Sequence, residues 1–269
     1  MSLPPGFKKR MTKLMDEQKD SQKRTVNPVP GPTSLESIIP GQSVSVEGGE
    51  FYLVRRRLEE LHSNADAVVK KYCILFTSDR EISRGLHSDF REFLDAAPAK
   101  IMFLDAETTG FSNTPLFLLG IMYFNGERFI IDQLFARDYS EEGPLLHYFS
   151  EFAPGFDILV TFNGKSFDAP FIRDRMIYHR KRFLWTQTHI DILHHSRRKW
   201  KEKLPDCKLQ TLEMEICSRR REGDVPGSLV PDVYREFVRS GDTRLLADVF
   251  HHNALDLITL TELTIVLLS

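Results

Sequence analysis

The most constraining feature of the sequence is a short apolar run that ends in acidic residues. Ile101–Leu104 contains only large apolar side chains and is followed directly by Asp105 and, two positions later, Glu107. Runs of this kind are typical of strands that are buried on both faces of a sheet. An extended chain points side chains two residues apart to the same side. The sequence therefore predicts a core strand that carries two carboxylates at its end.

A second acidic residue of this kind is Asp168. It stands between a predicted buried strand at 157–162 and a predicted helix at 169–178. An aspartate in this place commonly caps the helix that follows, because its side chain accepts the free amides of the first turn. The position is also a strand end, like that of Asp105, so a role in a shared acidic site stays open beside the capping role.

The third acidic position, Asp256, lies in the predicted final helix at 243–268. His252 precedes it by four residues and shares its helix face, while His251 precedes it by five. A single aspartate in an amphipathic helix is usually solvated. Apolar residues stand on both sides of Asp256, however, so we expect it close to the core.

The apolar runs at 116–124 and 129–135 are separated by a turn that contains Asn125 and Gly126. Asn-Gly between two apolar runs is a strong hairpin signal. Together with the strand at 101–104, these runs predict an antiparallel meander of three strands.

The order of strand 129–135, helix 142–152 and strand 157–162 predicts a parallel crossover after the meander. The expected fold class is therefore α/β, with a mixed sheet flanked by helices. Further helices are expected at 209–216, 231–239 and 243–268.

Composition divides the chain into three parts. Residues 1–34 hold basic residues and a proline-rich stretch but few large apolar side chains, which predicts a flexible basic leader. Residues 35–97 predict a small β-rich extension, with strands at 50–54 and 74–77. Residues 98–269 carry all three acidic positions and form the expected catalytic domain.

Charge and composition exclude several classes of protein. The 36 Lys and Arg against 38 Asp and Glu leave a formal charge of −2, so the chain has no global basic field. No apolar run approaches the roughly 20 residues that a membrane-spanning helix needs. The three cysteines form no Cys-x-x-Cys pair, and no apolar signal-peptide core follows the first residues. We expect a protein of the reducing cytoplasm without a membrane partner.

Taken together, Asp-x-Glu at 105–107, Asn-x-x-x-Phe-Asp at 163–168 and the His-rich segment before Asp256 resemble the three motifs of the DEDD, or DnaQ-like, 3′→5′ exonucleases. The resemblance covers roughly residues 100–265 and implies an RNase H-like fold. Within that superfamily the chain is most similar to the bacterial YprB group, on the segments 204–212, 224–227, 241–242 and 252–256.

The resemblance implies a metal site and a substrate site. Two Mg²⁺ or Mn²⁺ ions would be bound by Asp105, Glu107, Asp168 and Asp256, with Asp105 as the bridging ligand. Hard oxygen ligands favour these cations, and a pair of them supports phosphodiester hydrolysis. By the same analogy, Thr108, Phe111 and Asn163 would contact the terminal nucleotide.

The general base is either His251 or His252. In histidine-type relatives the base lies five residues before the last aspartate, which selects His251. In tyrosine-type relatives it lies four before, which selects His252, and the neighbouring Asn253 resembles the YprB pattern. Both imidazoles can titrate near neutral pH. We favour His251 and keep His252 as the alternative.

A basic segment at 173–203 is interleaved with Phe183, Trp185 and Trp200. Basic side chains neutralise phosphates and aromatic rings stack on splayed bases, so this segment is a candidate single-strand contact. Arg219–Arg221 would extend it. A solvated basic helix face is the alternative interpretation.

These patterns lead to the hypothesis of a metal-dependent exonuclease that acts on the 3′ ends of DNA or RNA, with single-stranded ends as the expected partner. A structure-selective endonuclease is one alternative, because RNase H-like folds support both activities. A nucleic-acid-binding adaptor with little catalysis is the other.

Overall fold

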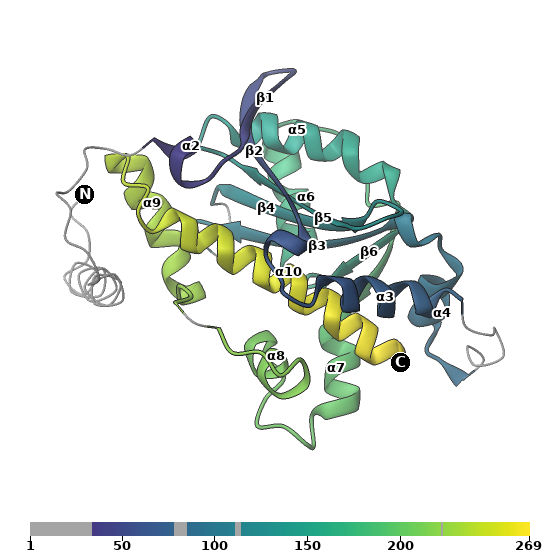
Figure 1. Cartoon of the computed structure of the whole chain (residues 1–269). Coiled ribbons are helices and arrows are strands. Elements are labelled where there is room, and N and C mark those ends of the chain that lie inside the picture. The colour runs from purple at the N-terminus through teal and green to yellow at the C-terminus, as the bar shows by residue number, and fades with distance from the viewer. Residues whose placement is uncertain (1–33, 78–84, 111–113, 222) are drawn as a thin grey trace. The chain divides into compact units, whose positions relative to one another are not determined.

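In the computed structural model, which describes residues 34–77, 85–110, 114–221 and 223–269, a seven-stranded mixed sheet occupies the centre (Figure 1). Its strands lie side by side in the order β1-β2-β5-β4-β3-β6-β7. The mixed α/β sheet flanked by helices, expected from the sequence, is confirmed. The strands are β1 (Gln42–Val46), β2 (Gly49–Arg57), β3 (Ile101–Thr108), β4 (Leu116–Phe124), β5 (Phe129–Phe135), β6 (Ile158–Thr161) and β7 (Thr188–Asp191).

Strands β3, β4 and β5 form the predicted antiparallel meander. The turn between β4 and β5 follows from its sequence: Gly126 has a φ of 102°, and the Asn125 side chain accepts hydrogen bonds from the amides of Glu127 and Arg128. Strands β6 and β7 continue the sheet in parallel to β3, with a helix between them. Strands β3 and β5 both run antiparallel to β4, so β5 and β6 run in the same direction, and the predicted parallel crossover from β5 through the helix Glu142–Phe152 to β6 is present.

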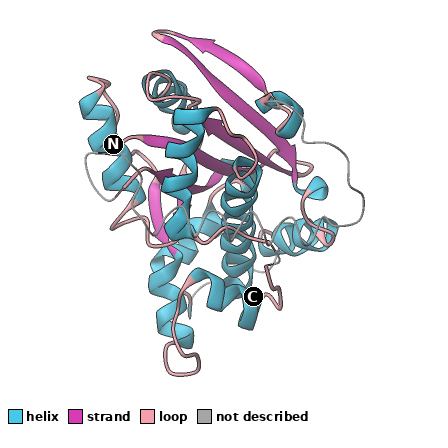
Figure 2. Cartoon of the chain, turned by 90° about the vertical axis from the view of Figure 1, so that its left-hand side faces the viewer, coloured by secondary structure: helices cyan, strands magenta, loops and turns pink. Residues whose placement is uncertain are grey.

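Helices cover both faces of the sheet (Figures 1 and 2). Alternate side chains of β3 show why: Ile101 and Phe103 join a core with α3, α4, α7, α8 and α10, while Met102 and Leu104 join a second core with α5 and α6. The helices are α2 (Leu35–Ile38), α3 (Ala65–Leu75), α4 (Ser88–Asp95), α5 (Glu142–Phe152), α6 (Asp168–Tyr178), α7 (Ile192–Trp200), α8 (Leu209–Ile216), α9 (Val230–Ser240) and α10 (Leu246–Leu268), with short 3₁₀ turns η1 (Leu58–Glu60), η3 (Pro98–Lys100), η4 (Ala153–Gly155) and η5 (Gly227–Leu229).

The segment 35–97 contributes two strands to this sheet. Strand β2 pairs with β5, and Arg55 on β2 binds Asp132, its direct partner on β5, through two hydrogen bonds of 2.6 Å. The strand expected at 74–77 is wrong, because Ile74 lies in the last turn of α3. The buried residues of α3, Ala65, Val68 and Tyr72, have helical spacing.

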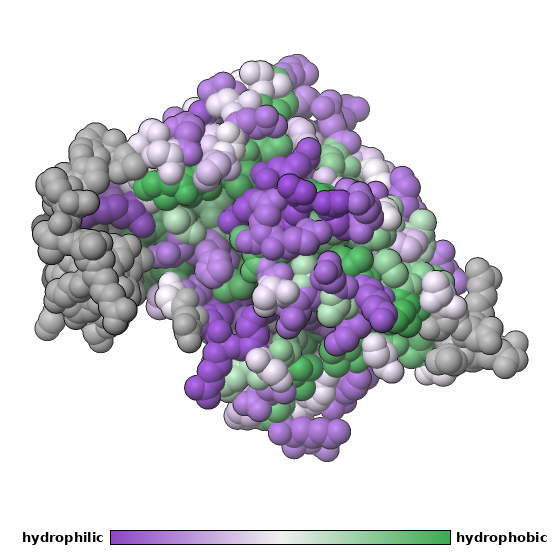
Figure 3. Space-filling view, in the orientation of Figure 1, coloured by the Kyte–Doolittle hydropathy of each residue, from purple (hydrophilic) through white to green (hydrophobic). Residues whose placement is uncertain are grey.

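Residues 1–33 of the expected leader lie outside the described residues. Among the residues that are described, no helix has both the length and the apolar composition needed to cross a membrane. The face of the molecule seen in Figure 3 carries hydrophilic residues over much of its middle, with hydrophobic residues gathered in smaller patches.

Helix α10 approaches the sheet closely at Gly120 on β4. Asp105, Gly120 and Gln133 stand opposite one another on β3, β4 and β5. Asn253 of α10 lies over this row: its Nδ2 donates to Asp105 Oδ2 at 2.8 Å, and its Oδ1 accepts from Gln133 Nε2 at 2.8 Å. A Cβ atom at position 120 would lie 2.2 Å from Asn253 Oδ1, so only glycine leaves room for the asparagine.

We expect Gly120→Ala to destabilise the protein by about 1–3 kcal/mol, the usual range for overpacking a core. Asn253 is buried and held by hydrogen bonds on both sides, so it cannot move aside freely. Urea unfolding measures the effect. The control is Gly155→Ala, where an added Cβ meets nothing within 4 Å. Equal midpoints for both variants and the wild type would contradict the close contact.

Candidate active site

Three elements bring four carboxylates together. Asp105 and Glu107 lie at the end of β3, Asp168 is the first residue of α6, and Asp256 lies on α10. Asp168 Oδ1 accepts a hydrogen bond of 3.2 Å from the amide of Ala106, which joins α6 to β3. The bond from Asn253 to Asp105 joins α10 to the same strand. The sequence-predicted acidic residues are thus neighbours in the structure.

The four carboxylates repel one another. Burial, together with the charges of Asp256, Glu107 and Asp168, raises the pKa of Asp105 well above its ordinary range. Burial and neighbouring acidic charges also raise the pKa of Glu107 to about 8 and that of Asp168 to about 7. Groups with such values retain protons near neutral pH unless a cation compensates their charge.

This donor set fits hard divalent cations. The residues offer carboxylate oxygens, the ligands that Mg²⁺ and Mn²⁺ prefer, and all four side chains remain partly accessible to solvent. Within the described residues, no three of these four carboxylates place one oxygen each within 4.8 Å of one another.

Arg221 supplies part of the missing positive charge. Its guanidinium contacts Asp256, binds Glu213 at 2.6 Å and binds Asp224 at 3.1 Å. Arg219–Arg221 were expected to extend the basic segment that would contact phosphates. Arg219 is instead paired with Glu213 at 2.7 Å, so both arginines are engaged inside the protein. The run of three arginines in the sequence does not show this pairing, because Glu213 and Asp256 come close to these arginines only in the folded chain.

His252 faces the carboxylates. Its Nδ1 lies 2.9 Å from both oxygens of Asp224, and its Nε2 lies 3.7 Å from Asp256 Oδ2. Burial alone would lower its pKa, but the bond to Asp224 and the charges of Asp256 and Glu107 raise the pKa of His252 to about 9. Asp224, which the sequence suggested only as part of a family motif, is therefore a partner of the histidine.

His251 has different surroundings. Consecutive helical residues point about 100° apart, so His251 cannot share the direction of His252. Burial, with the nearby Arg56 and Arg221, lowers the pKa of His251.

Asp191 positions the loop that carries Asp168. It is buried at the end of β7 and accepts hydrogen bonds from the amides of Asn163 at 2.7 Å and Lys165 at 3.1 Å. It also caps α7 through Leu193 N–H. Asn163 has a φ of 64°, a conformation that asparagine tolerates better than most residues, and the hydrogen bond from its amide to Asp191 holds it there.

The remaining residues that were expected to contact substrate lie in different surroundings. Thr108 is partly buried, and its hydroxyl donates to the carbonyl of Gly110 at 2.7 Å. Phe111 lies outside the described residues. Of the aromatic residues expected to stack on bases, Trp200 is buried in one core, and Phe183 and Trp185 pack against Phe149 of the other. Trp200 is therefore covered, whereas Phe183 and Trp185 are only half-buried. The sequence shows that a ring is apolar, but not whether another element covers it.

Without divalent cations, we expect the free energy of unfolding to fall as pH rises from about 4 to 8. The raised pKa values mean that folded Glu107 and Asp168 keep protons that the unfolded chain has released, so the unfolded state gains stability as pH rises. Urea unfolding in chelator at several pH values measures the trend.

Asp168→Asn, which removes one titrating group, should make the pH trend shallower. Mn²⁺ at a hundredfold excess over its Kd should add about 2.7 kcal/mol to the wild type at neutral pH. Stability that rises between pH 5 and 8 in chelator would contradict this account of the site.

Residues 102–268 match the sequence profile of the RNase H superfamily. YprB of Bacillus subtilis (strain 168), described as an uncharacterized protein, is 36% identical to this chain over 172 residues, which are 61% of this chain and 41% of YprB. The chain thus spans about two fifths of the length of that relative. The family B DNA polymerase of the archaeon Pyrobaculum calidifontis has a TM-score of 0.49 and 15% identity, over 62% of this chain and 24% of the polymerase.

The profile match begins within β3 and ends within α10, so it includes all four carboxylates. It agrees with the fold expected from the three acidic motifs. Because the match covers more than half of the sequence, the chain belongs to the RNase H superfamily.

Proposed function

We propose that the protein is a metal-dependent 3′→5′ exonuclease that hydrolyses the phosphodiester bonds of DNA or RNA from single-stranded 3′ ends. The observation that carries the proposal is the convergence of Asp105, Glu107, Asp168 and Asp256 from three separate elements. A protein that only binds nucleic acid has no use for four mutually repelling carboxylates, because they also repel phosphates.

Two Mg²⁺ or Mn²⁺ ions held by these carboxylates would supply positive charge for the attacking water and the leaving 3′ oxygen. Asp105 is near enough to the other three acidic residues for the charge of each to raise its pKa, which suits a shared ligand. Arg221 would give up part of its contact with Asp256 when that carboxylate binds a cation.

We further propose His252 as the general base. Asp224 holds its Nδ1, so Nδ1 would carry the proton, and Nε2, which lies 3.7 Å from Asp256 Oδ2, would be left to accept one from water. Compensation of the acidic charges would lower its pKa from about 9 toward neutrality, where a base is most effective.

Substrate would approach at the start of α6. Phe167, next to Asp168, has 55% of its surface exposed, and Tyr178 at the other end of the helix has 68%. Exposed aromatic rings can stack on the bases of a single strand. Thr108, Phe111 and Asn163 keep their proposed role at the terminal nucleotide.

Wild-type protein with Mn²⁺ should shorten a 5′-labelled single-stranded oligonucleotide to a descending ladder, and chelator should abolish the reaction. Asp105→Asn should lose the ladder, because the replacement removes a ligand charge and keeps the shape. Asp95→Asn is the matched control, since Asp95 is exposed at the end of α4. Parallel DNA and RNA substrates show which sugar is accepted.

Each other outcome of this assay contradicts part of the proposal. Activity that survives chelator would exclude the metal mechanism. Internal fragments without a ladder would indicate an endonuclease. Binding without cleavage in both the wild type and Asp105→Asn would indicate an adaptor.

His252→Ala should lower turnover by about 10²- to 10⁴-fold, the usual loss for a general base. His251→Ala is the neighbouring control and should retain most of the activity. Asp224→Asn should weaken activity and shift the pH–rate profile, because it changes the group that holds Nδ1. The reverse ranking of the two histidine variants would assign the role to His251.

A further inference from the structure

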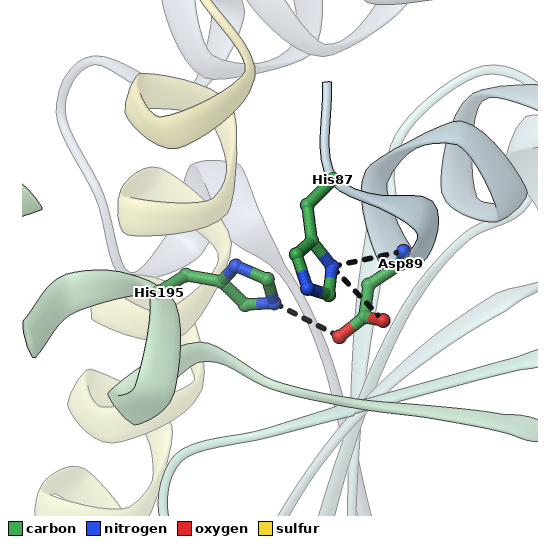
Figure 4. A group of neighbouring side chains, drawn as sticks. All are labelled: His87, Asp89 and His195. Carbon is green, nitrogen blue, oxygen red and sulfur yellow. Dashed lines mark hydrogen bonds and ion pairs between the residues drawn. The ribbon is translucent and has the colours of Figure 1, made fainter. Parts of the chain in front are cut away.

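A second group of potential metal ligands lies outside the carboxylate site (Figure 4). It consists of His87, the N-cap of α4, Asp89 in the first turn of α4, and His195 on α7. One ligand atom from each side chain lies within 4.8 Å of the other two. Figure 4 shows both imidazole rings turned toward the Asp89 carboxylate.

The carboxylate lies between the two rings. His195 Nε2 is 2.9 Å from Asp89 Oδ2, and His87 Nδ1 is 3.2 Å from Asp89 Oδ1. The centres of the two rings are 4.9 Å apart, with the planes at 79°. Two imidazole nitrogens and a carboxylate oxygen therefore surround one small volume.

The types of these side chains suit a metal. His195 is 4% exposed, so a ligand at this position is largely shielded from water. Neutral imidazoles with one carboxylate are typical ligands of Zn²⁺ and related transition metals, whereas Mg²⁺ prefers oxygen alone.

A simpler explanation, without a metal, is that His87 caps α4 and that one hydrogen bond joins His195 to Asp89. The amide of Asp89 donates to His87 Nδ1 at 3.3 Å, and Arg198 Nη1 lies 3.4 Å from His195 Nδ1. Both distances exceed the usual range for hydrogen bonds, so these two contacts add little to the 2.9 Å bond between His195 and Asp89. Histidine is also not among the residues preferred at an N-cap. A cap alone does not require a second, buried histidine on another helix.

We propose that His87, Asp89 and His195 bind a divalent transition metal of the zinc class, with water completing the coordination. The ion would join α4, from the segment 35–97, to α7, from the segment that carries the acidic motifs. Its role would be structural, and it does not depend on the proposed nuclease activity.

Co²⁺, whose visible absorption reports nitrogen ligands and low coordination number, is a direct probe. The titration is carried out on the full wild-type chain and on its Asp105→Ala variant, because the acidic site of the wild type can also bind Co²⁺. We expect one equivalent of Co²⁺ with a visible band in both the wild type and Asp105→Ala, and displacement of that band by Zn²⁺.

His87→Ser removes a ligand and keeps a preferred N-cap, so it separates metal binding from capping. It should weaken Co²⁺ binding by at least about tenfold, since even loss of an outer-sphere partner has this effect. Asp89→Asn should do the same. His194→Ala is the control, because His194 is the exposed neighbour of His195 on α7.

Two outcomes would overturn the proposal. One is the absence of a Co²⁺ band in Asp105→Ala, which would leave the acidic site as the source of any binding. The other is an unchanged band in His87→Ser and Asp89→Asn, with circular dichroism showing that both variants are folded.

Discussion

The contact between Asn253 and the sheet is the constraint on which the rest of the structure depends. Asn253 reaches Asp105 on one side and Gln133 on the other, across Gly120, which has no side chain to prevent it. This contact places α10 against the strand that ends in Asp105 and Glu107. It thereby brings Asp256, one helical turn further along, to the other three carboxylates. The fold and the acidic site have one physical origin.

Charge balance is the second constraint. Four carboxylates in a partly buried place are unfavourable, and the protein compensates them with Arg221 and His252, both anchored on Asp224. The same two residues define what a bound cation would change: it would loosen the contact of Arg221 with Asp256 and lower the pKa of His252. In the proposed function, the metal-free and metal-bound states therefore differ in the protonation of the base as well as in the charge of the site.

Much of the architecture was predictable because local signals were strong. The apolar runs and the Asn125-Gly126 turn give β4 and β5 with the observed bounds, and the helical spacing gives α5 and α8. The strand expected at 74–77 failed, since a short apolar run has no periodicity that distinguishes a strand from the end of a helix. The burial of Trp200 in the basic segment was missed for a related reason: sequence shows that a ring is apolar, but not whether another element covers it.

The sequence by itself determined the order of strands and helices from β3 to α6 and singled out the four carboxylates, because periodicity and strand-end positions are local properties. Only the tertiary structure decided what those residues contact. Asp224 beside His252, Asp191 under the Asn163 loop, Arg221 beside Asp256 and Asp89 between two histidines join residues between 2 and 106 positions apart. Most of these pairs join segments that share no sequence motif or periodicity. Their proximity comes from helices packing on a sheet, which no local stretch of the sequence encodes.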